Sequence, residues 1–316
     1  NPALETMTGR KADKVIGKKC NEVFKDIFVD GNVCSKCPMH DRSRTRSERI
    51  KANIRRNKTG EMRFVEVNHS MIDYGDKKGI VGTVRDITKD HELEIYYHDL
   101  RIATEVQKNI LPHSKPATAG LDIGFMCQPA KQIGGDYFDF IPLDNDKIGI
   151  AIGDVAGKSL SAALLVSMHK YILRAAVANT DSVISPLRAL NQIIWEDTSP
   201  EVFVTTIYGV YNYTTSTFIY ANAGHLPPLF CSGGQAKYLW SPQTPLGIQQ
   251  SLSIEQQQVR LDKGDMLVLL SDGVTDIRNN KGDCFGLERL RRFVKRNADL
   301  SAQELADRIY KHTVRF

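Results

Sequence analysis

Long hydrophobic runs, secretion features and abundant cysteine are all absent from this sequence of 316 residues. No uninterrupted apolar stretch is longer than residues 266–270, whereas a membrane-spanning helix needs roughly 18 such residues. The first residues lack the basic segment, apolar segment and cleavage site of a secretory signal. Six cysteines are too few for a disulfide scaffold in so long a chain. We therefore predict a cytoplasmic protein with reduced thiols and no membrane span.

Charge of one sign is in modest excess and is unevenly distributed. The net charge is +5, yet residues 1–90 hold 20 Lys and Arg against 13 Asp and Glu. The basic excess is densest over residues 42–63, a stretch without interleaved aromatic side chains or a nucleic-acid-binding motif. We interpret this stretch as a solvated face and predict no nucleic-acid partner.

The N-terminal region, which we assign to residues 1–89, alternates short apolar runs with turn signals. Lys58-Thr59-Gly60-Glu61 and Asp73-Tyr74-Gly75-Asp76 each separate two strand-like segments. This spacing predicts a hairpin meander with short helices in front of it, and hence a small α+β domain.

A helix is predicted between the two larger regions. Residues 90–111 contain neither Gly nor Pro and repeat apolar side chains at steps of three and four, which predicts a helix with one apolar seam. Pro112 ends it, because the residue before a proline is pushed out of helical geometry. The seam fits either packing within the chain or a parallel dimer. We assign residues 90–112 as a linker.

Strand-like and helical segments alternate through the C-terminal region, residues 113–316. β-Branched and aromatic residues predict strands at four places: residues 147–152, 203–210, 218–220 and 266–270. Apolar side chains repeat at helical spacing over residues 160–175 and 187–194, and Ser301-Ala302-Gln303-Glu304 has the form of a capping box. Because the strands come as hairpins separated by a helical block, we expect a sandwich of antiparallel sheets flanked by helices rather than a doubly wound sheet.

Three acidic motifs follow or begin strand-like runs in this region. They are Gly134-Gly135-Asp136, Gly153-Asp154-Val155 and Ser271-Asp272-Gly273, and we expect each to adjoin a central strand. A single Asp-Gly pair is an ordinary turn former, but turns alone do not explain three of them beside central strands. Converging carboxylates without Cys or His ligands suit a hard divalent cation, Mg²⁺ or Mn²⁺. Such a site predicts metal-assisted hydrolysis of a phosphate.

Two competing interpretations of these motifs fit less well. Residues 153–159 resemble a phosphate-binding P-loop, but the position of the first required Gly holds Ile152. Gly134-Gly135-Asp136-Tyr137-Phe138 resembles the Gly-Gly-Asp-Glu-Phe turn of diguanylate cyclases, but Tyr137 replaces the acidic residue. The later Asp motifs would also have no role in a cyclase, so we favour the metal site.

From residue 103 onward the sequence resembles the serine phosphatases related to stage II sporulation protein E, a bacterial branch of the type 2C (PPM) metal-dependent phosphatases. The matching motifs, in order, are residues 103–112, 134–139, 153–159 and 220–225, then Pro245-Leu246-Gly247 and Ser271-Asp272-Gly273. This resemblance implies an αββα sandwich that binds two Mg²⁺ or Mn²⁺ ions. It further implies that Asp154 and a water bridge the ions, with the Val155 carbonyl as another ligand. Asp272 would hold one ion, and Asp136 would act through coordinated waters.

The same resemblance assigns further positions and shows two departures. Lys131 lies where type 2C enzymes place a basic phosphate-binding residue, and Asp276 lies where some bacterial members hold a third ion. Ala156 replaces the His of many eukaryotic members, so water or another group would protonate the leaving oxygen. The family also has a terminal Asp-Asp-x-Thr strand, and this sequence reaches Phe316 without one. Either a longer chain supplies that metal-binding Asp, or metal affinity and turnover are weak. We interpret His225 as a turn residue rather than a catalyst.

Residues 1–89 resemble the C-terminal part of a PAS sensor domain, whose opening strands would precede Asn1. The segments that carry this resemblance are Met7-Thr8-Gly9, Val15-Ile16-Gly17-Lys18 and residues 79–88. PAS domains bind varied ligands, so the resemblance gives the class of domain and not its signal.

Four residues of the same region raise a separate question. Cys34 and Cys37, with Cys20 and His40 nearby, could bind a metal or respond to redox state. No second Cys-x-x-Cys pair completes a zinc site, so we favour free thiols on a solvated loop.

Together these features predict a PAS-regulated, metal-dependent serine/threonine protein phosphatase. By resemblance, its substrate is phosphoserine on a STAS-type anti-sigma-factor antagonist, in a pathway that controls transcription indirectly. We expect a homodimer through the linker helix and the PAS domain, in which a change in the PAS core reorients the helix and forms or breaks the metal site. The alternative is a catalytically silent module with a phosphatase fold that senses a ligand and docks a partner.

Overall fold

The computed structural model describes most of the chain as two compact units, Asn1–Asp99 and Leu100–Phe316. The described residues are 1–24, 27–29, 49–55, 60–118, 120–129, 134–144, 146–156, 160–178, 180–241 and 243–316. Residues named above that lie outside them are Cys34, Cys37, His40, Lys58, Thr59, Lys131 and residues 157–159. No helix within the described ranges is both long and apolar enough to cross a membrane. The domain boundaries drawn at residues 89 and 112 stay predictions.

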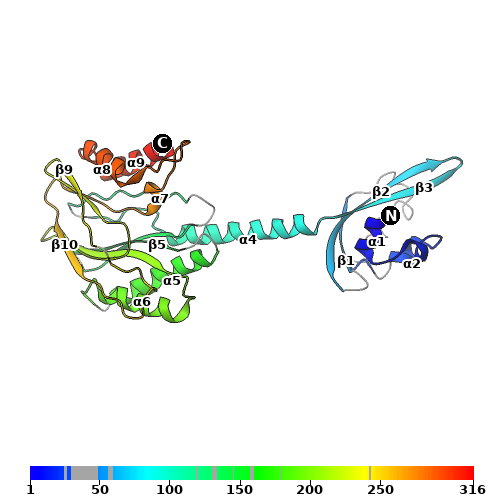
Figure 1. Ribbon diagram of the computed structural model, residues 1–316, viewed down its shortest axis with the longest axis horizontal. Coiled ribbons are helices and arrows are strands. Elements are labelled where there is room, and N and C mark those ends of the chain that lie inside the picture. The colour runs from blue at the N-terminus through cyan, green and yellow to red at the C-terminus, as the bar shows by residue number, and fades with distance from the viewer. Residues whose placement is uncertain are drawn as a thin grey trace. The chain divides into compact units, whose positions relative to one another are not determined.

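The first unit places short helices before an antiparallel sheet with strand order β1-β2-β3 (Figure 1). Its elements are α1 (Pro2–Thr8), the 3-10 helix η1 (Ala12–Lys14), α2 (Cys20–Phe24), β1 (Ile50–Arg55), β2 (Met62–Tyr74) and β3 (Lys77–Asp86). Gly75 has a φ of 58°, which lets β2 turn directly into β3. Ile27, Ile54 and Val65 form the centre of the core. The predicted meander behind short helices is confirmed, and Cys20 is exposed at the start of α2.

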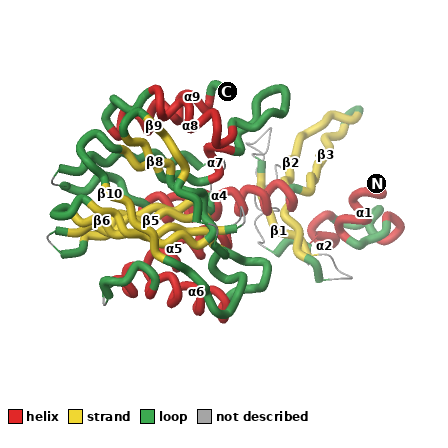
Figure 2. Tube along the Cα trace, turned by 60° about the vertical axis from the view of Figure 1, so that its left-hand side comes forward, coloured by secondary structure: helices red, strands yellow, loops and turns green. Residues whose placement is uncertain are grey.

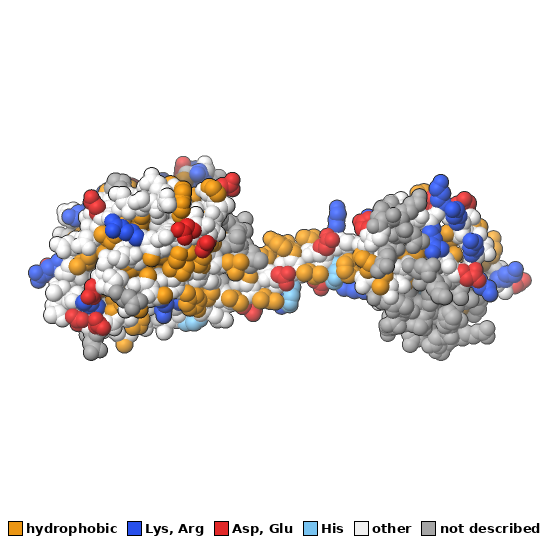
Figure 3. Space-filling view, turned by 90° about the horizontal axis from the view of Figure 1, so that it is seen from below, with side chains coloured by type: hydrophobic (Ala, Val, Ile, Leu, Met, Phe, Trp, Pro, Cys, Tyr) orange, Lys and Arg blue, Asp and Glu red, His pale blue; other side chains and the backbone are white. Residues whose placement is uncertain are grey.

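Helix α4 (Thr88–Ile110) confirms the helix predicted over residues 90–111. It begins where the Asp86 carboxylate accepts hydrogen bonds from the Thr88 amide and hydroxyl, at 3.0 and 2.6 Å. Large apolar side chains are about half exposed along it: Leu93, Ile95, Tyr96, Tyr97, Ile102 and Val106. Figure 3 shows hydrophobic side chains in orange along this helix.

The second unit stacks four layers in the order helix, sheet, sheet, helix (Figures 1 and 2). The larger sheet has the order β10-β7-β6-β5-β4, from β4 (Asp136–Pro142), β5 (Lys147–Val155), β6 (Val204–Asn212), β7 (Thr217–Ala223) and β10 (Gln256–Arg260). The smaller sheet has the order β11-β8-β9, from β8 (Leu229–Ser232), β9 (Gln235–Tyr238) and β11 (Met266–Val268). The helices are α5 (Leu160–Val177), α6 (Ser185–Asp197), the short α7 (Asp272–Thr275), α8 (Gly286–Arg296) and α9 (Ala302–Val314). This architecture confirms the predicted αββα sandwich of antiparallel sheets.

Alternation along the strands explains why the layers hold together. In β6, Ile207 belongs to the core between the sheets, and the next residue, Tyr208, belongs to the core beneath α5 and α6. Both side chains are almost fully buried, so this strand is covered on two faces. Leu290 of α8 and Leu305 of α9 close a third core against the smaller sheet. The predicted capping box is also confirmed, because Ser301 caps the start of α9.

The sheet order corrects one expectation from the sequence. Asp136 lies on β4 and Asp272 follows β11, and both strands are at the edge of their sheets. Only Asp154, on β5, is on an interior strand. The prediction of three central strands was wrong because an apolar run reports that its faces are covered by other layers. It does not report how many strands flank it.

Candidate metal centre

The antiparallel pairing of β4 with β5 places Asp136 directly opposite Asp154. Residues in this relation have Cβ atoms about 4.5–5.5 Å apart, so the two carboxylates are neighbours. The Val155 amide donates a hydrogen bond of 3.0 Å to the Gly135 carbonyl, which extends the pairing by one residue. The two predicted motifs Gly134-Gly135-Asp136 and Gly153-Asp154-Val155 therefore meet at one end of the larger sheet.

Gly135 leaves open a small space that two oxygen atoms face. A Cβ atom at this position would lie 2.6 Å from Asp154 Oδ1 and still closer to the Val155 carbonyl oxygen. Both distances are too short for any side chain, so only glycine is compatible with this arrangement. The carboxylate of Asp154 and the carbonyl of Val155 thus converge on the same space.

The third motif, Ser271-Asp272-Gly273, follows β11 of the smaller sheet and lies near Asp136. The Ser271 hydroxyl lies close enough to the Asp136 carboxylate to lower its pKa, and Asp136 Oδ2 lies 3.9 Å from where a Cβ of Gly273 would be. Burial and the neighbouring negative charge of Asp272 raise the pKa of Asp136, while the Ser271 hydroxyl opposes that shift. Asp272 itself is exposed at the first position of α7. The structure therefore brings together Asp136, Asp154 and Ser271-Asp272-Gly273.

Two other candidates are not brought into this group by any described contact. Asp276 is exposed at the C-cap of α7, where its amide donates to the Asp272 carbonyl at 2.8 Å. Its side chain accepts a long hydrogen bond of 3.5 Å from the Thr275 hydroxyl. Lys131 is outside the described residues.

The donors present fit a hard divalent cation. Within the described ranges, no three His, Cys, Asp or Glu side chains lie together as a ligand cluster. Here, however, the converging groups are carboxylate oxygens and the backbone carbonyl of Val155, and Mg²⁺ usually keeps several waters beside only one or two carboxylates. Burial, and to a smaller extent the charge of Asp272, raises the pKa of Asp136, and a bound cation would stabilise its ionised form.

Cys127 is a neighbour of this site that the sequence did not indicate. Burial and the charge of Asp136 raise the pKa of its thiol to about 11, so it is protonated and a poor nucleophile. No motif surrounds Cys127 in the sequence, so nothing there could have placed it beside Asp136.

Gln107 of α4 is a second residue that sequence reasoning did not single out. Its Nε2 donates to the Gly134 carbonyl at 2.6 Å, and its Oε1 accepts from the Gly134 amide at 3.2 Å. The side chain is buried, with 6% of its surface exposed. A polar residue within an otherwise apolar helix seam was the available signal.

His225 lies in the turn after β7, as the sequence analysis proposed. Asn222 brackets the turn, because its side chain accepts from the His225 amide at 2.8 Å and donates to the His225 carbonyl at 3.0 Å. The ring is buried, and burial lowers its pKa to about 4, so it is neutral at physiological pH.

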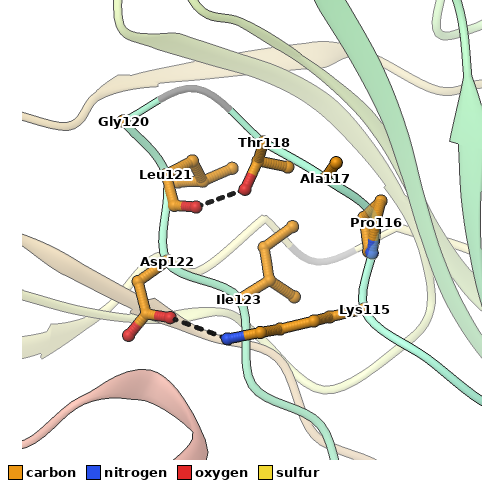
Figure 4. A pocket seen from close by; sticks show the side chains of 8 residues that line it. All are labelled: Lys115, Pro116, Ala117, Thr118, Gly120, Leu121, Asp122 and Ile123. Atoms are coloured by element: carbon orange, nitrogen blue, oxygen red, sulfur yellow. Dashed lines mark hydrogen bonds and ion pairs between the residues drawn. The ribbon is translucent and has the colours of Figure 1, made fainter.

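One cavity of the second unit lies away from these carboxylates. It has a volume of about 440 Å³ and is lined by eight residues of the segment after α4: Lys115, Pro116, Ala117, Thr118, Gly120, Leu121, Asp122 and Ile123 (Figure 4). An ion pair of 3.6 Å between Lys115 and Asp122 crosses it. None of the candidate metal ligands lines this cavity, so we do not assign the chemistry to it.

Two family models match this chain. Residues 144–316 match the stage II sporulation protein E (SpoIIE) family, and residues 1–89 match the PAS domain family. The chain is 36% identical over 244 residues to phosphoserine phosphatase RsbU of Bacillus subtilis, a match that covers 76% of this chain and 70% of RsbU.

Other relatives and a solved structure are more distant. Phosphoserine phosphatase RsbP of B. subtilis is 27% identical over 184 residues, which cover 56% of this chain and 45% of RsbP. Protein IcfG of Synechocystis is 26% identical over 220 residues, which cover 61% of this chain and 35% of IcfG. The SiaA-PP2C domain of Pseudomonas aeruginosa superposes with a TM-score of 0.61 at 19% identity, over 72% of this chain and 91% of that domain. This last likeness concerns the fold.

Proposed function

The chain belongs to the stage II sporulation protein E family of PP2C-type serine phosphatases, and we propose that it hydrolyses phosphoserine on a protein under the control of its PAS domain. The observation that carries this proposal is the space in front of Gly135. Asp154 Oδ1 and the Val155 carbonyl oxygen both face it, and Asp136 lies on the opposing strand. This is an oxygen-donor site of the kind that phosphate hydrolysis by hard cations requires.

PP2C-type enzymes are typically metal-dependent, and we propose that this chain uses Mn²⁺ or Mg²⁺. Two such ions, when bound, would lower the pKa of coordinated water and neutralise charge on the phosphate. Asp154, the Val155 carbonyl and Asp272 are the proposed ligands, and Asp136 is proposed to act through coordinated waters. Asp276 is the proposed ligand of a third ion.

Other residues near the proposed metal site have supporting roles and are not metal ligands. Gly135 keeps the space free of side-chain atoms, and the neighbouring Ser271 hydroxyl lowers the pKa of Asp136 and so favours its carboxylate form. Lys131, outside the described residues, is the proposed phosphate-binding residue. The protonated thiol of Cys127 is not suited to be a nucleophile, which agrees with direct attack by water.

The proposed substrate is a phosphorylated STAS-type anti-sigma-factor antagonist, with the chain acting in the cytoplasm and controlling transcription indirectly. RsbU and RsbP are both named phosphoserine phosphatases, and RsbU is similar to this chain over 76% of its length. The choice of substrate rests on the family resemblance.

Regulation is proposed to pass through α4. At the end of this helix within the second unit, Gln107 holds Gly134, and the Lys170 ammonium donates to the Ile110 carbonyl. Gly134 is two residues from Asp136, so a displacement of the helix end would move a proposed metal ligand. The half-exposed apolar side chains along α4 suit a homodimer through this helix and the PAS domain.

Hydrolysis of a small aryl phosphate with added Mn²⁺ tests the catalytic proposal. We expect activity that requires Mn²⁺ and disappears in Asp154→Asn. The matched control is Asp181→Asn, the same change at an exposed residue that forms an ion pair with Lys147, at 3.0 Å. Activity that persists without metal, or in Asp154→Asn, would contradict the proposal.

The alternative function is a catalytically silent module that senses a ligand and docks a partner. Wild-type protein that binds no Mn²⁺ and hydrolyses nothing would favour this alternative. The hydrolysis assay, together with a calorimetric titration of Mn²⁺ into the same three proteins, therefore distinguishes the two functions.

A further inference from the structure

The proposed metal ligands come from two different sheets. Asp136 and Asp154 lie on strands of the larger sheet, whereas Asp272 follows β11 of the smaller sheet. The spacing between the two groups therefore depends on how the sheets are held together at this end. One connection passes directly between the sheets, from β7 in the larger to β8 in the smaller, and it contains His225.

On the side of the larger sheet, His225 contacts the strand next to Asp154. Its Nδ1 lies 2.8 Å from the hydroxyl oxygen of Thr205. Thr205 is directly opposite Asp154 in the pairing of β5 with β6, and its hydroxyl is 3.5 Å from the Asp154 carbonyl oxygen. One ring nitrogen of His225 is thus anchored to the position that faces Asp154.

On the side of the smaller sheet, His225 faces the segment that leads to Asp272. The connection that contains His225 runs into β8, and β8 pairs with β11, the strand that precedes Asp272. The second ring nitrogen, Nε2, is buried and has no partner of normal hydrogen-bond geometry within the described ranges. The backbone of Leu270 is nevertheless close enough to oppose the lowering of the ring's pKa.

We propose that His225 is a positioning residue that sets the distance between Asp154 and Asp272 by linking the two sheets. The neutral ring carries its proton on Nε2, directed at the Leu270 carbonyl, and accepts a hydrogen bond from Thr205 on Nδ1. This inference rests on the proposed metal site, which it deepens. Groups that orient ligands in this way typically change metal affinity by about 10- to 100-fold when they are removed.

A second buried histidine provides the matched control. His169 of α5 is fully buried, and its Nε2 lies 3.4 Å from the hydroxyl of Thr206, the residue after Thr205. Consecutive strand residues point to opposite faces, so His169 occupies the other face of the larger sheet, beneath α5. It has the same chemistry and burial as His225 but lies on the face away from the smaller sheet.

The test is calorimetric titration of Mn²⁺ into the full chain and into its His225→Phe, His225→Gln and His169→Phe variants. Phe keeps the ring volume without polar atoms, and Gln returns an amide donor near the place of Nε2. We expect His225→Phe to bind Mn²⁺ about 10- to 100-fold more weakly, His225→Gln to recover part of the loss, and His169→Phe to bind like the wild type. Thermal unfolding in EDTA shows that each variant is folded.

Thr205→Val keeps the inference testable if His225→Phe does not fold. It removes only the hydroxyl that holds Nδ1, and we expect it to weaken Mn²⁺ binding while Thr205→Ser does not. Equal losses in His225→Phe and His169→Phe, or unchanged binding in His225→Phe or Thr205→Val, would overturn the positioning role. Asp154→Asn tests the proposed metal site separately from the positioning role of His225. If the wild-type protein binds Mn²⁺ no better than Asp154→Asn, the proposed metal site is overturned, and the inference with it.

Discussion

Gln107 and Gly134 exchange two hydrogen bonds, so that the end of α4 is tied to the backbone beside Asp136. The donated bond is 2.6 Å long and the accepted bond 3.2 Å, and the glutamine side chain is buried. A buried side chain with both amide atoms satisfied by one residue restricts that residue in position and orientation. The linker helix is therefore hydrogen-bonded directly to the segment that leads into β4, the strand that carries a proposed metal ligand.

Gln107→Ala is expected to weaken the response to metal. It removes both hydrogen bonds to Gly134, each worth about 1 kcal/mol, so the Mn²⁺ concentration for half-maximal activity should rise about tenfold or more. Lys108→Ala is the control, because Lys108 is exposed on the next position of the same helix. An unchanged Mn²⁺ requirement in Gln107→Ala would show that Gly134 is held in place without the helix.

Gly135→Ala is expected to abolish most of the metal-dependent hydrolysis. The new Cβ would lie 2.6 Å from Asp154 Oδ1, so Asp154 or Val155 must move. A misplacement of about 1 Å in an active site can lower the rate by about 100-fold. Gly79→Ala is the control, the same change on β3 of the first unit, where the nearest atom would be 3.5 Å from the Cβ. We expect Gly79→Ala to stay within a few-fold of wild type in the aryl phosphate assay. Full activity in Gly135→Ala would mean that the space in front of this residue is not the reaction site.

The sequence predicted which segments of the second unit form strands better than it predicted the order of those strands in the sheets. The runs that became β5, β6 and β7 are rich in β-branched and aromatic residues, and this local property predicts strands reliably when both faces are covered. The order of strands depends on pairing between distant segments, so the edge position of β4 and β11 had no local signal. The acidic motifs were found because each combines Asp with Gly, and the structure explains one such Gly, Gly135, by a close approach.

Contacts between segments that are distant in the sequence could not be predicted either, because they leave no local sequence signal. Gln107 looked like a polar interruption of an apolar seam, and its partner lies 27 residues away. His225 was correctly placed in a turn, but its contacts with Thr205 and the backbone of Leu270 depend on how two sheets stack. Cys127 had no motif at all.

Asp139→Asn is expected to destabilise the second unit strongly. Asp139 is fully buried, and Arg174 donates to its two carboxylate oxygens at 2.6 and 2.8 Å, while the Lys170 ammonium lies 3.5 Å away. Removing the negative charge leaves the nearly buried Lys170 ammonium without its ionic partner, whereas the Arg174 side chain is 39% exposed and stays partly hydrated. We therefore expect a cost at or below the lower end of the roughly 3–5 kcal/mol that breaking a fully buried pair takes.

Urea unfolding followed by tryptophan fluorescence measures this cost, because Trp195 and Trp240 both lie in the second unit. Asp181→Asn again serves as the comparison, because Asp181 and Lys147 form a solvent-exposed ion pair, and such pairs contribute little to stability. Similar losses in Asp139→Asn and Asp181→Asn would show that the buried cluster is not held together by its charges.

His169 is expected to make the second unit less stable in acid. Burial lowers the pKa of its ring to about 4, whereas an unfolded histidine titrates near pH 6.5. Between these values the unfolded chain binds the proton and the folded chain does not, so stability is complete above about pH 6.5 and falls as the pH drops towards 4. One histidine contributes a slope of up to about 1.4 kcal/mol per pH unit in this window.

The same fluorescence measurement at several pH values should show a shallower fall in His169→Phe. Thr206→Val removes the hydroxyl near His169 but leaves the ring buried, so its stability should be lower at every pH while the slope remains. A slope that is identical in wild type and His169→Phe would assign the acid sensitivity to the carboxylates instead.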